Sequence, residues 1–319
     1  MLAMLGLCGP GCGNDVRALL PDGGATPQNM QQRWPRLGLP AEVAGRNLFA
    51  VSGAAFDSVV IVGERGTVLS WDGMKLSLQP AVTDKDLKAV TMVSPTRGFA
   101  VGDLGTILRL DGTTWSLEPT DSTANLLGVW ADDTRALAVG ESGAAVLLEA
   151  PMPWRTIMND SPDHLHGVAS VGGQVVAVGT LGTVSQLRGR GMMARMQRSA
   201  VRDYLKTLEA TSSGPGGTFA VGVDGAVFQW QSGFRRVKLD TLPASVLRGV
   251  ASTDGGLFVV GNDATVARVV GMDVLVYPDI PERWAYGVWG SSGTDVWVVG
   301  ASGMLLHGPP LVDPVGVMP

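Results

Sequence analysis

Few side chains in this sequence are suited to metal binding or to nucleophilic catalysis. The three histidines are His164, His166 and His307. His164 and His166 would share one face of a strand, at a spacing that two metal ligands can use, but His307 is distant in the sequence and no carboxylate is placed to complete the set. No serine lies in the Gly-x-Ser-x-Gly pattern of a nucleophile elbow. We therefore predict no metal site, no bound cofactor and no Ser-His-Asp hydrolase.

Acidic residues recur in the short turns that follow Val-Gly pairs. If these turns share one face of the fold, the acids would surround the mouth of a channel and attract cations or a basic peptide, with strong salt dependence. Asp also favours turns for its local hydrogen bonds, so solvated acids without a binding role are the alternative. A glycan hydrolase or lyase would need two such carboxylates as a pair. The five acids are Glu64, Asp103, Glu141, Asp224 and Asp263.

A basic segment spans residues 188–206, where three methionines stand among the arginines. Methionine adapts to varied contacts, so this edge is a second candidate surface for a protein partner. A strand edge protected by charge and a short helical insertion are the alternatives. Nucleic acid is not an expected partner, because the net charge is −5 and the segment lacks interleaved aromatic residues. The five arginines are Arg188, Arg190, Arg195, Arg198 and Arg202.

An internal repeat supplies the elements that would position these residues. Successive Val-Gly pairs are separated by 39, 38, 39, 43, 39 and 39 residues, and in six of the seven units a second glycine follows three residues after the first. Such regular spacing indicates an array of seven units. The pairs are Val62-Gly63, Val101-Gly102, Val139-Gly140, Val178-Gly179, Val221-Gly222, Val260-Gly261 and Val299-Gly300.

Each unit has the pattern of four short antiparallel strands, and its length is close to the ~40–45 residues of a propeller blade. Asp72-Gly73 and Asp111-Gly112 can adopt positive φ in hairpin turns. The 44 glycines fit many tight turns, and the 45% apolar content fits a buried core. No unit has a helical period. We predict an all-β, seven-bladed β-propeller over residues 33–308, with four antiparallel strands in each blade.

A small residue precedes the key apolar residue of each expected first strand. First strands converge on a propeller axis, where large side chains would collide. The nine tryptophans mostly fall at equivalent positions in the units, which favours packing between blades over a sugar-binding surface. The seven small residues are Ala50, Ala89, Gly128, Gly167, Thr207, Gly249 and Gly287.

The seventh unit has only three expected strands, and the Pro-rich tail over 309–319 cannot form a paired central strand. Upstream of the first unit, Trp34 resembles Trp115, which begins a fourth strand. We predict that residues 33–39 pair with the 304–308 strand and complete the last blade. Closure of the ring would remove an unpaired sheet edge.

The beginning of the chain resembles the end of a bacterial lipoprotein signal. Cys8 and Cys12 lie in an apolar and then Gly-rich stretch, and Gly11 is the small residue that such signals place before the acylated cysteine. We predict a signal segment over 1–12 with lipidation at Cys12, followed by a flexible tether over 13–32. Incidental cysteines at a frayed terminus are the alternative. No other stretch is long and apolar enough to span a bilayer, so the membrane would be reached through the lipid alone.

The repeat also resembles that of a known group of propellers. "GVWGSSGTDVWVVGASGMLLHG" (287–308) is similar to the repeats of secreted or lipidated bacterial propellers of the YVTN/BNR-like and WD40-like class, which includes photosystem II assembly and stability factors. The resemblance extends over residues 33–308. It implies a non-catalytic protein-binding scaffold or assembly factor in the bacterial cell envelope, in the outer membrane or periplasm, or secreted. We expect a monomer with a protein partner. A glycan-acting hydrolase or lyase, and a sensor of a small ligand or ion, are the alternatives.

Overall fold

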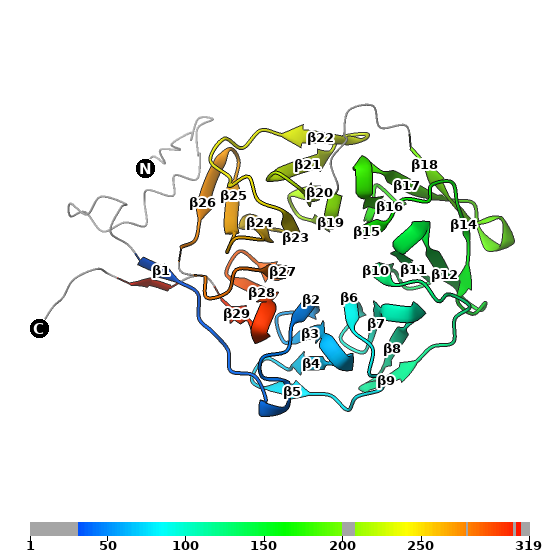
Figure 1. Ribbon diagram of the computed structural model, residues 1–319, viewed down its shortest axis with the longest axis horizontal. Helices are drawn as coiled ribbons and strands as arrows, with labels where there is room; N and C mark the ends of the chain where they lie inside the picture. The colour runs from blue at the N-terminus through cyan, green and yellow to red at the C-terminus, as the bar shows by residue number, and fades with distance from the viewer. Residues whose placement is uncertain (1–30, 200–207, 279, 309–310, 314–319) are drawn as a thin grey trace, which may run out of the picture.

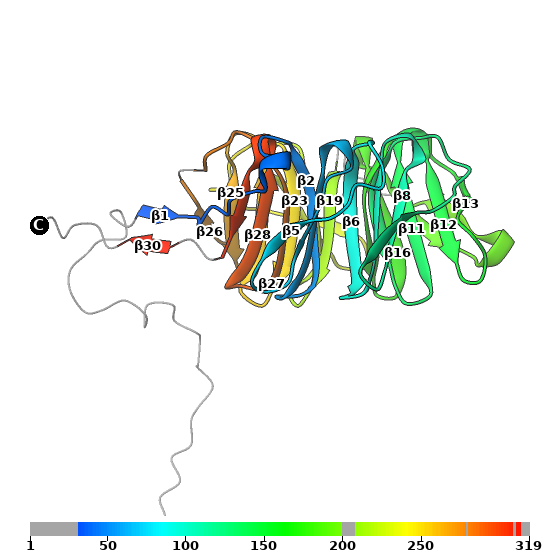
Figure 2. The same cartoon turned by 90° about the horizontal axis from the view of Figure 1, so that it is seen from below.

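The computed structural model describes residues 31–199, 208–278, 280–308 and 311–313. Seven small sheets follow one another in chain order around a central axis (Figure 1). Seen edge-on, the ring has the β1–β30 pair lying outside it (Figure 2). The predicted all-β, seven-bladed propeller is confirmed. The predictions for Cys12 and Arg202 lie outside the described residues.

The first three blades each contain four antiparallel strands. Blade one consists of β2 (Leu48–Ala55), β3 (Ser58–Gly63), β4 (Val68–Trp71) and β5 (Leu76–Leu78). Blade two consists of β6 (Leu87–Ser94), β7 (Arg97–Gly102), β8 (Ile107–Asp111) and β9 (Thr114–Leu117). Blade three consists of β10 (Leu126–Ala131), β11 (Arg135–Gly140), β12 (Ala145–Glu149) and β13 (Arg155–Thr156).

Blade four adds a fifth strand to the pattern, because β14 (Met158–Asn159) pairs in parallel with its outer strand. Its other strands are β15 (Leu165–Val171), β16 (Gln174–Gly179), β17 (Val184–Arg188) and β18 (Arg195–Arg198). Blade five consists of β19 (Leu208–Gly214), β20 (Gly217–Gly222), β21 (Ala226–Trp230) and β22 (Phe234–Val237). Blade six consists of β23 (Leu247–Thr253), β24 (Gly256–Gly261), β25 (Val266–Val270) and β26 (Asp273–Val276). Blade seven has β27 (Ala285–Ser292), β28 (Asp295–Gly300) and β29 (Leu305–His307), and the separate pair is β1 (Gln31–Arg33) with β30 (Leu311–Asp313).

The Val-Gly-x-x-Gly signature encodes the tight connection between the second and third strands of a blade. In blade two, a Cβ at Gly102 would collide with the carbonyl oxygen of Asp86, just before β6. Gly105 has φ +73°, and a Cβ there would collide with the carbonyl oxygen of Ser122. Glycine meets both demands, since it adopts positive φ freely and lets another backbone approach closely. The repeated glycine pattern in the sequence therefore corresponds to one type of turn, between the second and third strands, that recurs around the ring.

The helices among the described residues are all 3-10 helices of three residues. None of them is long and apolar enough to cross a membrane. Five form the connection just described, and the other two precede β2 and β18. They are η3 (Ala41–Val43), η4 (Glu64–Gly66), η5 (Asp103–Gly105), η6 (Glu141–Gly143), η7 (Thr180–Gly182), η8 (Gly191–Met193) and η9 (Ala301–Gly303).

Alanine or glycine occupies the predicted axial position in every blade. The assignment of Thr207 to blade five is wrong, because Ala210 pairs with Val221 there, as Gly167 pairs with Val178 in blade four. The Val-Gly pairs of blades four and five are 43 residues apart rather than 38 or 39, so the sequence pattern placed the axial residue of blade five three positions too early. Thr207 itself is outside the described residues. The seven axial residues are Ala50, Ala89, Gly128, Gly167, Ala210, Gly249 and Gly287.

Seven apolar clusters hold the ring together, one between each pair of successive blades. At each interface a side chain near the start of a fourth strand packs toward the second strand of the preceding blade. Trp154, for example, meets Phe99 edge to face with ring centroids 5.5 Å apart, a geometry that aromatic quadrupoles favour. The equivalent side chains in blades one to six are Leu76, Trp115, Trp154, Met196, Phe234 and Val274.

Blade seven has three strands in the described part of the chain. Beside β29, Arg36 forms an isolated antiparallel bridge with Leu306. The amide of Leu37 donates a hydrogen bond to the carbonyl oxygen of Leu305 at 3.0 Å. The predicted range 33–39 thus lies next to the last strand at these points, although it is not a continuous strand.

The position of Trp34 follows from that bridge. In this register Trp34 takes the place next to β29 that Trp115 takes next to β8 in blade two. Its side chain is 8% exposed and meets Tyr277 of blade six edge to face, with centroids 5.5 Å apart. Trp34 therefore belongs to the cluster between blades six and seven.

Replacement of Trp34 by alanine is expected to lower the free energy of unfolding by about 3–5 kcal/mol, because a buried aromatic side chain is lost and a cavity remains. Chemical denaturation followed by circular dichroism measures the change. Trp284 is 48% exposed, so Trp284→Ala is the matched control and should change stability by less than about 0.5 kcal/mol. Equal stability of the wild type and Trp34→Ala would show that this indole does not hold the interface.

Candidate functional site

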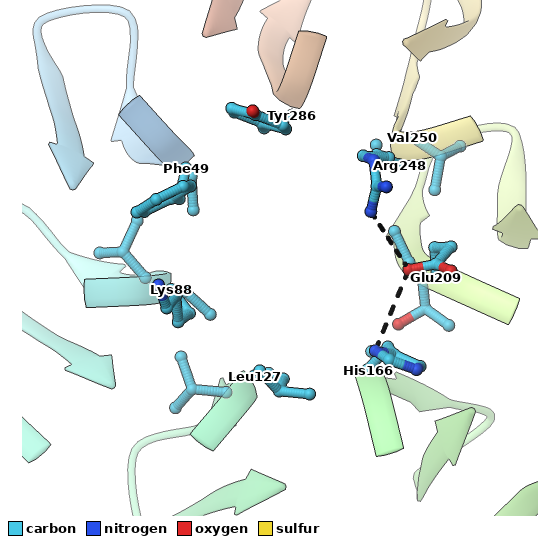
Figure 3. Close-up of a pocket in the computed structure, with 18 of the residues that line it drawn as sticks. Phe49, Lys88, Leu127, His166, Glu209, Arg248, Val250 and Tyr286 are labelled. Atoms are coloured by element: carbon cyan, nitrogen blue, oxygen red, sulfur yellow. Dashed lines mark ion pairs between the residues drawn. The ribbon is translucent and has the colours of Figure 1, made fainter. Parts of the chain in front are cut away.

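Seven side chains, one from each blade, surround a cavity on the channel axis (Figure 3). Each is the second residue of its blade's first strand, directly before the small axial residue. The cavity has a volume of about 190 Å³. We call these side chains the channel ring: Phe49, Lys88, Leu127, His166, Glu209, Arg248 and Tyr286.

One arc of the channel ring is charged and polar. Glu209 lies between its two neighbours, with a carboxylate oxygen 3.7 Å from the Arg248 guanidinium and 4.0 Å from His166 Nδ1 (Figure 3). Arg248 Nε also donates a hydrogen bond to the side-chain oxygen of Asn262 at 2.8 Å. The Glu209 carboxylate therefore faces two partners within the chain before any ligand arrives.

The opposite arc is aromatic and apolar, with one lysine in it. Phe49 and Tyr286 contact each other with centroids 5.6 Å apart, and Leu127 lies across the cavity from them (Figure 3). Lys88 Nζ lies 4.3 Å from the Phe49 ring centroid, within cation–π range. The same ammonium is 2.9 Å from the Asp86 carboxylate. Aromatic contact and ion pairing together hold this lysine against the wall.

Burial determines the protonation of two ring members. Burial lowers the pKa of His166 below its ordinary value of 6.5 and outweighs the opposing attraction of Glu209. Burial also raises the pKa of the Tyr286 hydroxyl above its ordinary value of 10.0. Both side chains are therefore neutral near pH 7, and each has a hydrogen to donate. His166 Nε2 is buried and has no hydrogen-bond partner among the described residues.

The arrangement suits the binding of a side chain better than acid–base chemistry. Among the described residues that line the cavity, Glu209 is the one carboxylate. Glycoside hydrolysis normally needs two. Within the described part of the chain, no three His, Cys, Asp or Glu side chains are grouped to hold a metal ion. The cavity is also smaller than the roughly 300 Å³ at which small-molecule sites begin.

The five predicted acids lie in the turns between second and third strands, but at two different positions. Glu64, Asp103 and Glu141 directly follow the Val-Gly pair. Asp224 and Asp263 come one residue later, both at φ +55°. The turns are close to the channel ring, since Asp103 is 3.6 Å from Lys88 and the charge of Glu141 acts on the pKa of His166.

These acids have interaction partners within the chain. A cation beside a carboxylate reduces the field that an approaching partner would experience. Lys88 and Arg283 therefore neutralise part of the predicted acidic mouth from within. The partners include Asn47 for Glu64, Lys88 for Asp103, Asn125 for Glu141 and Arg283 for Asp263.

The predicted basic edge lies on the outer strands of blade four. Met192 and Met193 are 83% and 82% exposed, whereas Met196 is buried at the interface with blade three. A short 3-10 helix of three residues, η8, lies within the described part of this segment. Strand β18 is not an open edge, because β14 pairs with it and places Met158 opposite Arg195. The exposed arginines are Arg188, Arg190, Arg195 and Arg198.

The ring centroids of His164 and His166 lie 6.4 Å apart, whereas His307 belongs to another blade. His164 is exposed and accepts a hydrogen bond from the Ser142 amide at 3.2 Å, while His166 points into the channel ring. His307 is 2.7 Å from the Asp295 carboxylate and stacks on Trp297 with centroids 3.8 Å apart. Burial opposes ionisation of Asp295, but hydrogen bonds from His307 and a serine hold its pKa below the usual value.

The channel ring was missed at the sequence level, although its signal is present. Each ring residue directly precedes the axial Ala or Gly, so alignment of the first strands would have found six of the seven. Glu209 was hidden because blade five was read three residues out of register, with Thr207 in place of Ala210. The ring side chains share no chemical type, and a search for a motif does not detect them.

No protein-family model matches this sequence, and no curated protein is significantly similar to it. Among solved structures, YCF48 from Cyanidioschyzon merolae superimposes with a TM-score of 0.64 at 16% identity, covering 86% of this chain and 98% of that one. YCF48 bound to a D1 peptide gives 0.67 at 16% identity, with 89% and 99% covered. The WD40 β-propeller domain of Doa1 gives 0.68 at 12% identity, with 87% and 96% covered. At these identities the likeness establishes the propeller fold alone.

The lowered pKa of His166 makes stability depend on pH. Between the folded and unfolded pKa values the unfolded chain binds more protons, so stability is complete above about pH 6.5 and falls as the pH drops toward the folded-state value. His166→Gln lacks this titration. We expect the wild type to lose more in Tm than His166→Gln between about pH 7.5 and 5.5, as measured by thermal unfolding. Equal losses in the two proteins would contradict a buried neutral imidazole.

Proposed function

We propose that this chain is a non-catalytic propeller that binds a segment of a partner protein at the channel ring. The observation that carries the proposal is the division of the ring into two arcs around a cavity with room for about one side chain. An amphipathic segment would place an apolar or aromatic side chain against Phe49, Leu127 and Tyr286. Its polar groups would then face the arc that contains Glu209.

A polar atom without a partner in the ring gives a peptide something to bind. A buried donor or acceptor without a partner costs about 1–3 kcal/mol. His166 Nε2 is such an atom among the described residues. With the proton of the neutral imidazole on Nδ1, which faces the Glu209 carboxylate, Nε2 would accept a hydrogen bond from a backbone N–H of the partner. The Tyr286 hydroxyl, neutral near pH 7, would donate one. Peptide backbone, which offers an N–H and a carbonyl oxygen at nearly every residue, matches this pair.

The solved structures supply a precedent for the same fold. One of the similar propellers is described as YCF48 bound to a D1 peptide. Propellers host unrelated activities, so this precedent supports peptide binding here by analogy with the fold and does not identify the partner. A role as an assembly factor is the corresponding proposal for this chain.

The acids around the ring and the basic edge would contribute in different ways. We assign a steering role to the acidic turns, because Glu64, Glu141 and their neighbours favour the approach of a segment with flanking basic residues. The exposed methionines and arginines of blade four offer a second, weaker surface. We propose the channel ring as the primary site, because it combines a cavity with a buried polar atom, His166 Nε2, that has no partner among the described residues.

A glycan-acting hydrolase or lyase is less well supported. Such an enzyme needs a pair of carboxylates at the scissile bond. In the cavity as described, Glu209 would have to act alone while facing Arg248 and His166. The acids in the turns are not among the described residues that line the cavity.

We also propose that the N-terminal segment completes blade seven. The bridge between Arg36 and Leu306, the hydrogen bond from Leu37 and the burial of Trp34 support this. Trp34 would act as the fourth-strand anchor of the last blade, as Trp115 does in blade two. The two ends of the propeller would then be tied in one sheet, which removes an exposed strand edge.

Attachment to the bacterial cell envelope is a further proposal, based on the N-terminal sequence. Lipidation at Cys12 would anchor the propeller to the outer membrane or in the periplasm through the segment that precedes Trp34. The lipid would thus bring the channel ring close to membrane proteins without a membrane-spanning helix.

A displayed random-peptide library tests the primary site. Peptides selected on the wild-type propeller are expected to lose about 10-fold or more in affinity for Phe49→Ala and Tyr286→Ala, because each variant removes an aromatic contact worth about 1.5–3 kcal/mol when buried. Isothermal titration calorimetry with the best peptide measures the loss. Arg195→Ala and Met192→Ala on the basic edge are the matched controls.

Three outcomes would count against the channel ring. Peptides that bind the wild type and the ring variants with equal affinity would place the site elsewhere. Peptides that lose affinity only for the Arg195 and Met192 variants place it on the basic edge. Hydrolysis of a polysaccharide by the wild type, lost in Glu209→Gln, would establish the enzyme instead.

Anchoring is tested with Cys12→Ser in a bacterial host. The variant cannot be acylated, so it is expected to move from the membrane pellet to the soluble fraction after cell disruption. Immunoblotting of the two fractions measures the shift, and Cys8→Ser is the matched control that should stay in the pellet. Retention of Cys12→Ser in the membrane fraction would contradict the lipid anchor.

A further inference from the structure

The interface between blades five and six differs from the other six in the side chain that its fourth strand supplies. Val274 of β26 pairs with Val269 at the register position where Trp115 pairs with Leu110 in blade two. The other interfaces have a larger side chain at this position, four of them aromatic. These side chains are Leu76, Trp115, Trp154, Met196, Phe234 and Trp34.

The missing bulk leaves an aromatic residue uncovered. Phe219 on β20 is half-buried, although it lies on the second strand two residues before the Val-Gly valine, where the side chains of all six other blades are buried. Next to it is a cavity of about 550 Å³ between the two blades. The buried equivalents are Val60, Phe99, Leu137, Val176, Phe258 and Trp297.

The groove between blades one and two is a natural comparison. It has the corresponding walls but a volume of about 360 Å³, and Trp115 is one of the residues that line it. Val274 does not line the larger cavity between blades five and six. The valine is too short to reach the space that an indole occupies in the smaller groove.

We propose that the cavity between blades five and six binds a small, neutral, planar aromatic molecule. The other interfaces indicate the shape of the ligand. At four of them, the space that is empty between blades five and six is occupied by an aromatic side chain of the protein itself. Where the facing residue is also phenylalanine, Trp154 meets Phe99 edge to face at 5.5 Å. An aromatic ligand next to Phe219 reproduces that contact, which is favoured by the ring quadrupoles.

The cavity is large enough to admit a free molecule. A volume of 550 Å³ lies within the roughly 300–1,000 Å³ of small-molecule sites and exceeds what one side chain fills. Phe219, Val227, Val237 and Leu257 supply an apolar wall. Such walls bind apolar surface without directional requirements.

The charged residues at the rim, Arg268 and Asp254, already have partners within the chain, so the cavity favours a neutral ligand. Arg268 Nε donates to the carbonyl oxygen of Gly255 at 2.7 Å. The Asp254 carboxylate accepts a hydrogen bond from the Gly293 amide at 2.6 Å. A charged ligand would have to displace one of these contacts. No residue of the channel ring lines this cavity, so the site is independent of the proposed peptide site.

Indole is the probe that tests the site, with binding to the full chain measured by isothermal titration calorimetry. Val274→Trp places an indole of the chain where Trp115 lies in blade two, so we expect it to abolish indole binding and to raise the Tm. Phe219→Ala removes the facing ring and should weaken binding by about 5-fold or more. Circular dichroism confirms that each variant is folded.

Leu275→Trp is the matched control. Leu275 is 44% exposed and adjacent to Val274 on the same strand, so its side chain lies on the other face of the sheet. This variant adds the same side chain outside the cavity and should bind indole as the wild type does. Unchanged indole binding by Val274→Trp, or no binding of millimolar indole to the wild type, overturns the proposal. Binding of a short tryptophan-containing peptide, but not of indole, would assign the cavity to a partner's side chain and would also overturn it.

Discussion

Crowding at the axis is the constraint on which the rest of the structure depends. The first strands of neighbouring blades approach so closely that a Cβ at Gly249 would lie 3.2 Å from the Cα of Gly287, and one at Gly128 would lie 2.7 Å from the carbonyl oxygen of His166. Only alanine or glycine occupies this level, because interiors are packed at the density of organic crystals. One residue earlier on each strand the space opens, and larger side chains can extend toward the axis. The channel ring is therefore a consequence of the same crowding.

Between blades, stability depends on one anchor per interface. At six of the seven interfaces an aromatic or long aliphatic side chain next to the third strand closes the gap, and the identity of that side chain varies. Two interfaces depart from the pattern in informative ways. Blades six and seven receive their anchor, Trp34, from the opposite end of the chain, whereas blades five and six have Val274 and keep a cavity. A small side chain at one repeated position is thus sufficient to convert a packing interface into a candidate ligand site.

The candidate peptide site shows how a symmetric scaffold carries an asymmetric surface. Seven equivalent positions place their side chains at one level, yet the backbone does not restrict their chemistry. The result is an aromatic arc opposite an arc in which Glu209 faces both Arg248 and His166. The acidic turns outside it are largely engaged with Asn and Lys partners, so their charge contributes to the order of the turns as well as to the field at the mouth.

The sequence by itself determined the fold class, the number of blades and the glycine turns, because these rest on local backbone demands that recur every 39 residues or so. It also placed the acids in their turns and Trp34 near the last blade. Tertiary structure alone decided which side chains converge, since Phe49 and Arg248 meet at the axis from strands about 200 residues apart. It also decided the register of blade five, where Ala210 replaces Thr207, and the cavity beside Phe219. Convergence and voids depend on the packing of distant segments, which no local pattern encodes.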